Sequence, residues 1–121
     1  MPFADPRARL EHILEAIREI EGFAAGRTLQ DYLSQGWLRF ATQRGIEIVS
    51  EASRHLPDDL KATHPEIPWR DIAGIGNILR HGYDSLEHAV IWGVVDNDLP
   101  PLKAAVEALL RDADENDSDR A

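Results

Sequence analysis

The segment DPRARLEHILEAIREIEGFAAG, residues 5–26, carries the signals of a complete amphipathic α-helix. Asp5 suits the N-cap and Pro6 the first helical position, because a proline has no amide hydrogen to leave unpaired there. Gly26 predicts the end of the helix. Apolar residues recur every three or four positions, which predicts one buried face: Leu10, Ile13, Leu14, Ile17, Ile20 and Phe23.

A second helix is predicted from Leu29 to Leu56, with Thr28 as its cap. Gly36 and Gly45 interrupt this segment and indicate either close helix packing or a bend. The apolar stripe that we expect to face the core is formed by Leu29, Leu33, Trp37, Phe40, Ala41, Ile48 and Ala52.

The remaining segments also have helical patterns. Pro68 is suited to the start of a third helix that ends between about Arg80 and Gly82, and Ser85 to the cap of a short segment ending near Val95. Asp98 is expected to cap the last helix, with prolines in its first turn. Strand alternation and tight hairpin turns are scarce. The sequence therefore predicts an all-α fold, an up-and-down bundle of about four main helices plus short ones.

Composition limits the classes of function. The 121 residues suit one domain, which we place at residues 1–111, followed by an acidic tail at 112–121 that we expect to fray. The net charge of −9 argues against broad nonspecific nucleic-acid binding, so any RNA contact would need a local basic patch. There is no cysteine, and the N-terminal segment has no long apolar run. We expect a cytoplasmic protein with no membrane span.

No cofactor or metal site is expected. The histidines lack the close spacing of metal-ligand pairs: His12, His55, His64, His81 and His88. The tryptophans, Trp37, Trp69 and Trp92, are more typical of core or dimer anchors than of base-stacking platforms. On the second helix, Arg44 and Glu47 have the spacing of an ion pair.

The segment from Ile67 to Tyr83 holds the residues suited to chemistry. On a helix, Arg70, Gly74, Asn77 and His81 would form one stripe. A histidine at a helix C-terminus is favoured in its protonated form and can exchange protons near neutral pH. The same position also suits a histidine that only satisfies the last backbone carbonyls.

Several ordered segments resemble the HepT-like toxin family of the HEPN superfamily, namely residues 45–52, 65–69, 77–83, 90–92 and 98–102. The resemblance implies an all-α homodimer that cleaves RNA without a metal ion. It also implies a toxin–antitoxin pair, in which a nucleotidyltransferase antitoxin neutralises the toxin by adding AMP to a tyrosine. Glu51 would then lie in the interior as a structural tie to the third helix.

The resemblance assigns roles to individual residues. His81 matches the motif histidine, Tyr83 the modified tyrosine, and Asn77 the polar residue after the motif arginine. The arginine itself is replaced by Gly76. Arg80 follows one helical turn later, and helical side chains lean toward the N-terminus, so Arg80 is a candidate to supply the missing positive charge. We therefore predict His81, Arg80 and Asn77 as catalytic residues.

Two other hypotheses remain open at this stage. The chain could be a catalytically degenerate HEPN module that acts as a non-enzymatic binding partner, because the motif arginine is missing. It could instead be an accessory subunit of a nucleotidyltransferase that acts on another substrate.

Overall fold

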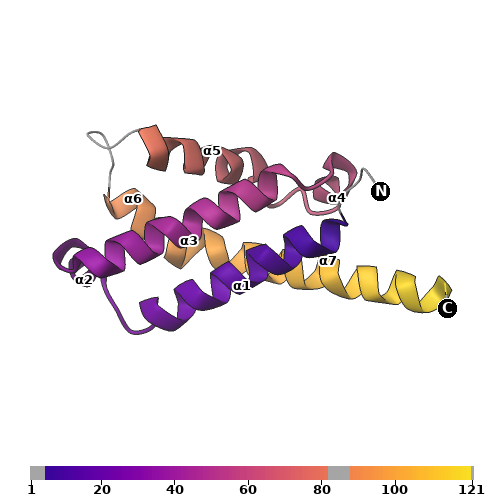
Figure 1. Cartoon of the computed structure of the whole chain (residues 1–121), viewed down its shortest axis with the longest axis horizontal. Helices are drawn as coiled ribbons and strands as arrows, with labels where there is room; N and C mark the ends of the chain where they lie inside the picture. The colour runs from indigo at the N-terminus through magenta and orange to yellow at the C-terminus, as the bar shows by residue number, and fades with distance from the viewer. Residues whose placement is uncertain (1–4, 82–87, 121) are drawn as a thin grey trace.

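The computed structural model describes residues 5–81 and 88–120, and this part of the chain is helical without a strand (Figure 1). The predicted all-α bundle is confirmed. The helices are α1 (Pro6–Ala24), α2 (Leu29–Ser34), α3 (Gly36–Arg54), α4 (Asp58–Ala62), α5 (Trp69–His81), α6 (His88–Gly93), a π-helical turn η2 (Val94–Asp98) and α7 (Leu99–Arg120).

The four long helices α1, α3, α5 and α7 form the bundle. In Figure 1, α3 runs between α1 and α5, and α7 lies behind α1. Ile13, Ile17 and Ile20 of α1 are fully buried, as are Leu38 and Ile46 of α3 within a few per cent. Burial of each such side chain contributes roughly 1.5–3 kcal/mol, so this apolar centre is what fixes the helices against one another.

Both ends of α1 agree with the prediction. The Asp5 carboxylate accepts a hydrogen bond from the Arg7 amide at 2.9 Å, and Pro6 is the first helical residue. Beyond the helix, Gly26 has a φ of 72°, a left-handed conformation that residues with a Cβ rarely adopt. The sequence therefore specifies where this helix starts and stops.

The prediction of one helix from Leu29 to Leu56 is wrong, because the helix is interrupted at Gln35. Thr28 caps α2 in a reciprocal capping box with Asp31, but Gln35 is extended, with φ −116° and ψ 107°. α3 then starts at Gly36 with a different rotation about its axis.

The predicted inward stripe is wrong at four positions for the same reason, whereas Ala52 is buried as expected. Phe40 is 75% exposed and Trp37 is 50% exposed, and Leu33 and Ile48 are also exposed. Besides Ala52, the residues of α3 that face the core are Leu38, Thr42, Ile46, Val49, Ser50 and Ser53.

The C-terminal third also differs from the prediction. Asp98 lies inside a continuous helical run formed by η2 and α7, so it is not the free N-cap that we expected. Ser85 lies outside the described residues. α7 includes nearly all of the acidic segment 112–121, and an ion pair between Arg7 and Asp114 ties it to the start of α1. The domain boundary at residue 111 stays a prediction. In the described ranges, no helix is long and apolar enough to cross a membrane.

Candidate functional site

The outward side of α5 carries the predicted polar stripe. Ile72 and Leu79 are buried, whereas Arg70, Gly74 and Asn77 are exposed. Position 81 ends the helix and falls in register with Asn77 and Gly74. The side chain of His81, predicted as catalytic, and the whole of Tyr83, predicted as the modified tyrosine, lie outside the described residues, so only the position of His81 at the end of α5 is known.

Gly76 lies where α5 comes closest to α3. The Ser50 hydroxyl of α3 donates a hydrogen bond to the Ala73 carbonyl at 3.0 Å and accepts one from the Gly76 amide at 3.1 Å. A Cβ at position 76 would lie 2.7 Å from the Ser50 Oγ, which is too close for two non-bonded atoms. Glycine at this position therefore lets the serine bond directly to the backbone of α5.

Arg80 extends back over Gly76. Its Nη1 lies 3.6 Å from the point where a Cβ of residue 76 would be. The half-buried Arg80 also lines a surface hollow of about 310 Å³ with residues of α1 and α3: Arg9, His12, Arg44, Glu47, Ile48, Glu51 and Ala52. Sequence reasoning missed the participation of Ser50, Arg9 and His12, because these residues meet only through the packing of three helices.

The carboxylates of this hollow have partners of their own. Glu47 accepts a hydrogen bond from Arg44 at 3.4 Å, which confirms the ion pair expected from their spacing. The imidazole of His55 is hydrogen-bonded to Glu51 at 3.0 Å, and this contact lowers the pKa of Glu51 below its ordinary value, with smaller contributions from the charges of Arg54 and Arg80. Glu51 is exposed, so the prediction that it lies in the interior is wrong.

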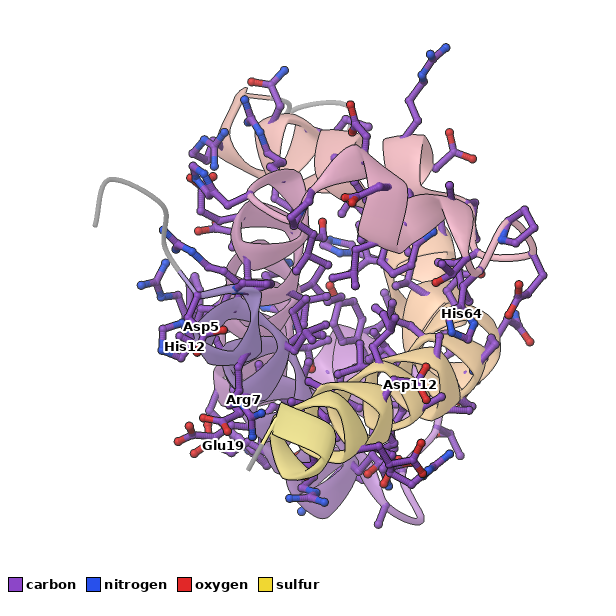
Figure 2. The ribbon with its side chains drawn as sticks, turned by 90° about the vertical axis from the view of Figure 1, so that its right-hand side faces the viewer. Asp5, Arg7, His12, Glu19, His64 and Asp112 are labelled. Carbon is purple, nitrogen blue, oxygen red and sulfur yellow. The ribbon has the colours of Figure 1, made fainter. Side chains whose placement is uncertain are left out.

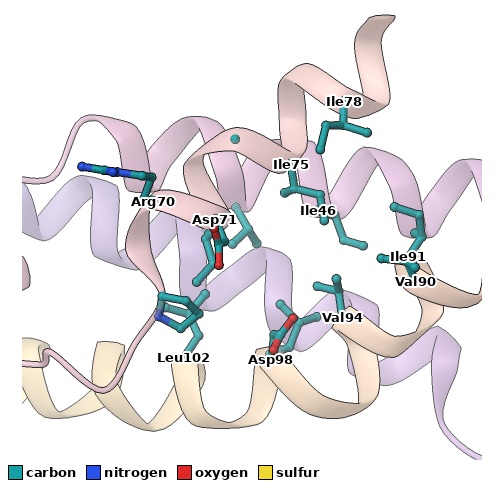
Figure 3. Close-up of a pocket in the computed structure, with 15 residues that line it drawn as sticks. Ile46, Arg70, Asp71, Ile75, Ile78, Val90, Ile91, Val94, Asp98 and Leu102 are labelled. Atoms are coloured by element: carbon teal, nitrogen blue, oxygen red, sulfur yellow. The ribbon is translucent and has the colours of Figure 1, made fainter. Parts of the chain in front are cut away.

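A second cavity lies on the opposite flank of α5. It is an apolar groove of about 560 Å³ between α3, α5, α6, η2 and the start of α7. Figure 3 shows Ile75 and Ile78 on the α5 side and Val90 and Ile91 on the α6 side. Ile78 and Val90 are each more than half exposed.

Charged groups lie at the edge of this groove. Asp71 and Asp98 approach it from α5 and η2, and the Arg70 side chain extends away from the apolar residues (Figure 3). The groove therefore has an apolar centre with charges of both signs near its edge.

The histidines with described side chains do not converge. His12 lies on α1 and His64 on the other side of the bundle, as Figure 2 shows. His64 and His55 each contact a glutamate, and the ring of His88 packs against Tyr32 with centroids 5.5 Å apart. Among the described side chains, no group of three or more histidine, aspartate or glutamate residues could hold a metal ion.

The three tryptophans differ in environment. Trp92 is buried, and its ring lies 5.3 Å from that of Tyr32, centroid to centroid. Trp69 is half-buried and donates its indole N–H toward the carbonyls of Lys61 and His64, at 3.1 and 3.0 Å. Trp37 is exposed, so the core-anchor interpretation applies to the first two only.

Comparison with known proteins gives a consistent result. The profile of the family described as "Ribonuclease HepT-like" matches residues 13–109. A Thermococcus cleftensis protein named "Probable ribonuclease HepT" is 42% identical over 100 residues, which cover 83% of this chain and 91% of that protein. Two proteins named "Putative RNase", from Methanocaldococcus jannaschii and Caldanaerobacter subterraneus, are 32% and 31% identical, over 85% and 88% of this chain and 94% and 95% of their own lengths. No solved structure matches the chain significantly.

The contact between Ser50 and α5 leads to a stability prediction. Gly76→Ala should lower the free energy of unfolding by about 1–3 kcal/mol through overpacking, although alanine is the better helix former. In a Ser50→Ala background the same change should be less damaging, because the Oγ atom at 2.7 Å is gone. Urea denaturation of the four proteins measures this coupling. Equal losses in both backgrounds would contradict it.

Proposed function

Because the chain belongs to the HepT-like ribonuclease family, we propose that it is a toxin that cleaves RNA without a metal ion, with His81, Arg80 and Asn77 as its catalytic groups. Family membership supports the class of reaction. The assignment to residues rests on the motif positions of α5 and on the location of Arg80 beside Gly76.

The reaction requires groups that α5 presents together. A base removes the proton of a ribose 2′-hydroxyl, the oxygen attacks the adjacent phosphorus, and the bond to the 5′-oxygen breaks as that oxygen takes up a proton. We assign both proton transfers to His81, the last residue of α5: its neutral imidazole accepts the 2′-hydroxyl proton, and the imidazolium that forms, which a helix C-terminus stabilises, donates a proton to the 5′-oxygen. Asn77 is exposed one turn earlier, and we assign it a hydrogen bond from its side-chain amide to the phosphate.

The positive charge is assigned to Arg80. The phosphorane carries additional negative charge, and a guanidinium stabilises it through paired hydrogen bonds. Position 76 offers no side chain, and a Cβ there would collide with Ser50. The single observation that carries the assignment is the 3.6 Å between the Arg80 Nη1 and that empty Cβ position. Arg80 thus extends over the turn of α5 where the family has its arginine.

The apolar groove favours assembly of the chain into a homodimer. Ile78 and Val90 are exposed beside an apolar cavity, and apolar patches of this kind mark interaction sites. Arg70 and the carboxylates of Asp71 and Asp98 give the same surface both signs of charge. A two-fold interface requires such self-complementarity, because each patch meets its own copy. Pairing through this surface would bring two copies of α5 close together.

The antitoxin is proposed to be a nucleotidyltransferase that transfers AMP from ATP to the Tyr83 hydroxyl. The tyrosine oxygen would bond to the α-phosphorus, and pyrophosphate would leave. The product carries a new negative charge two residues from His81. Such a charge would repel the RNA backbone and pair with neighbouring arginines. The modification would therefore inhibit RNA cleavage without unfolding the protein.

A degenerate module is the second candidate. Gly76 is buried against Ser50 and contributes no charge, so the chain could retain the family's fold and partner without cleaving RNA. If the chain is a degenerate module or an accessory subunit, the purified protein should bind a nucleotidyltransferase and leave RNA intact.

Arg80→Ala and His81→Ala should each lower the rate of RNA cleavage by about 100-fold or more, because each removes a group needed in the transition state. The readout is single-turnover cleavage of a labelled single-stranded RNA in the presence of EDTA. Arg18→Ala is the matched control, since Arg18 lies near Glu107 of α7, away from the hollow. Parent-like cleavage by Arg80→Ala would overturn the assignment to Arg80, and an inactive parent protein would favour the degenerate module.

Ile78→Glu should convert the dimer into a folded monomer, because it places a charge in the apolar surface. Sedimentation velocity reports the assembly state, and circular dichroism reports folding. Leu33→Glu, at an exposed apolar position on α2, should leave the dimer intact. A dimer that survives Ile78→Glu would place the interface elsewhere.

Co-expression with a nucleotidyltransferase encoded next to the gene for this chain should increase the mass of the chain by one AMP group. The Tyr83→Phe substitution should abolish this increase. Intact-protein and peptide mass spectrometry locate the adduct. An AMP adduct on a different residue would refute the proposed antitoxin chemistry. The absence of any adduct on a toxin that the partner has neutralised would refute it as well.

A further inference from the structure

One face of α3 combines two exposed aromatic rings with an arginine. Trp37, Phe40, Arg44, Ile48 and Glu51 recur every three or four residues, so their side chains form a single row. Phe40 is the most exposed of the large hydrophobic residues in the described part of the chain, at 75%. Three residues of this row, Trp37, Phe40 and Ile48, belong to the stripe that the sequence pattern placed in the core, and the break at Gln35 turns them outward. We call it the α3 face.

The aromatic end of the α3 face is preorganised. The guanidinium of Arg27 lies 4.9 Å from the centre of the Trp37 ring, and the rings of Phe23 and Trp37 are nearly perpendicular, with centroids 6.5 Å apart. The indole N–H of Trp37 donates to the Gln35 side chain at 3.0 Å. Trp37 is therefore held in place although half of its surface is exposed.

Phe40, one turn along, is the open platform. Among the described side chains, it takes part in no ring contact. Exposure of a large aromatic ring to water is unfavourable in free energy. A planar group stacked on the ring would remove this unfavourable exposure.

The other end of the α3 face is the basic hollow. Arg9, Arg44 and Arg80 come from three helices and line one depression, together with His12. The acidic residues there are Glu47, which pairs with Arg44, and Glu51, which pairs with His55 and also lies in the field of Arg80. Among the described residues Arg9 has no carboxylate partner within ion-pair distance. The hollow is thus a local basic patch on a chain of net charge −9.

We propose that the α3 face binds single-stranded RNA, with phosphates in the hollow at Arg9 and Arg44 and bases stacked on Phe40 and Trp37. This proposal rests on the proposed function, because it names the path by which the substrate reaches Arg80. Stacking on aromatic rings and pairing of arginines with phosphates are the two contacts by which proteins bind single strands without reading sequence.

The dimensions agree with a short single strand. From Trp37 to Glu51 the helix rises by about 21 Å, at roughly 1.5 Å per residue, which is enough for a few nucleotides. Arginines lie at both ends, Arg27 over Trp37 and Arg80 in the hollow. The remainder of the acidic surface would repel the backbone, which favours this one track.

The α3 face is tested by binding of a fluorescein-labelled, 2′-O-methylated single-stranded RNA, which cannot be cleaved because its 2′-oxygen carries no proton. Fluorescence anisotropy gives the dissociation constant. Phe40→Ala should raise it by about tenfold, given the usual contribution of a stacked base. Phe40→Trp should preserve binding, and Phe40→Leu should weaken it as alanine does, because leucine is apolar but offers no π surface.

Arg9→Ala and Arg44→Ala should each weaken binding and reduce the slope of log affinity against log salt by about 0.7, as expected for one lost phosphate contact to a single strand. Arg18→Ala should change neither. Circular dichroism of each variant checks that the fold is kept.

The outcomes separate this proposal from the function on which it rests. Unchanged RNA binding in Phe40→Ala, in a protein that still cleaves RNA, would refute the α3 face and leave the ribonuclease standing. Phe40-dependent RNA binding in a protein that cleaves nothing would support the α3 face and refute the ribonuclease. Full RNA binding by Phe40→Leu, with loss of an antitoxin complex in the same variant, would assign the face to a protein partner and overturn the proposal.

Discussion

The contact between the Ser50 hydroxyl and the backbone of α5 is the constraint on which the rest of the candidate site depends. It joins the Ala73 carbonyl and the Gly76 amide to α3, so it sets both the depth and the rotation of α5. With that rotation fixed, Ile72 and Leu79 face the core and Asn77 faces outward. Position 76 is then buried, and any side chain there would displace the serine. The proposed chemistry therefore needs a positive charge from a neighbouring turn, and Arg80 extends back over Gly76.

The exposed aromatic rings follow from a second local constraint, the extended Gln35 between α2 and α3. One continuous helix would have kept Leu29, Leu33, Trp37 and Phe40 on a single side. The break lets α2 and α3 bury different residues: α2 buries Tyr32, whereas α3 buries Leu38 and Ile46. Close packing reinforces the rotation of α3, because Gly45 approaches Ile20 so closely that a Cβ would lie 2.7 Å from it.

Sequence reasoning was accurate where the signal is local. Asp5, Pro6 and Gly26 mark α1, and Pro68 precedes α5 by one residue, because caps and proline geometry act within one turn. It failed where tertiary packing decides. Periodicity recognised α3 as amphipathic but chose the wrong face, since Thr42, Ser50 and Ser53 are polar by type yet buried. The hollow could not be predicted either: Arg9, Arg44 and Arg80 are far apart in sequence and meet only in the bundle. His81, Arg80 and Asn77 remain predictions about chemistry.

The positions of the two surfaces relative to α5 make them compatible. The apolar groove is lined by Asp71, Ile75 and Ile78, whereas the hollow meets α5 at Arg80, on the flank that faces Glu51. A second copy seated on the groove would therefore leave the α3 face open, and α5 would lie between the dimer contact and the RNA. Since the net charge of −9 opposes any other approach of a phosphate backbone, the arginines of the hollow would direct RNA to the helix that ends in His81. In this proposal, an acidic protein acts on RNA through one local basic surface.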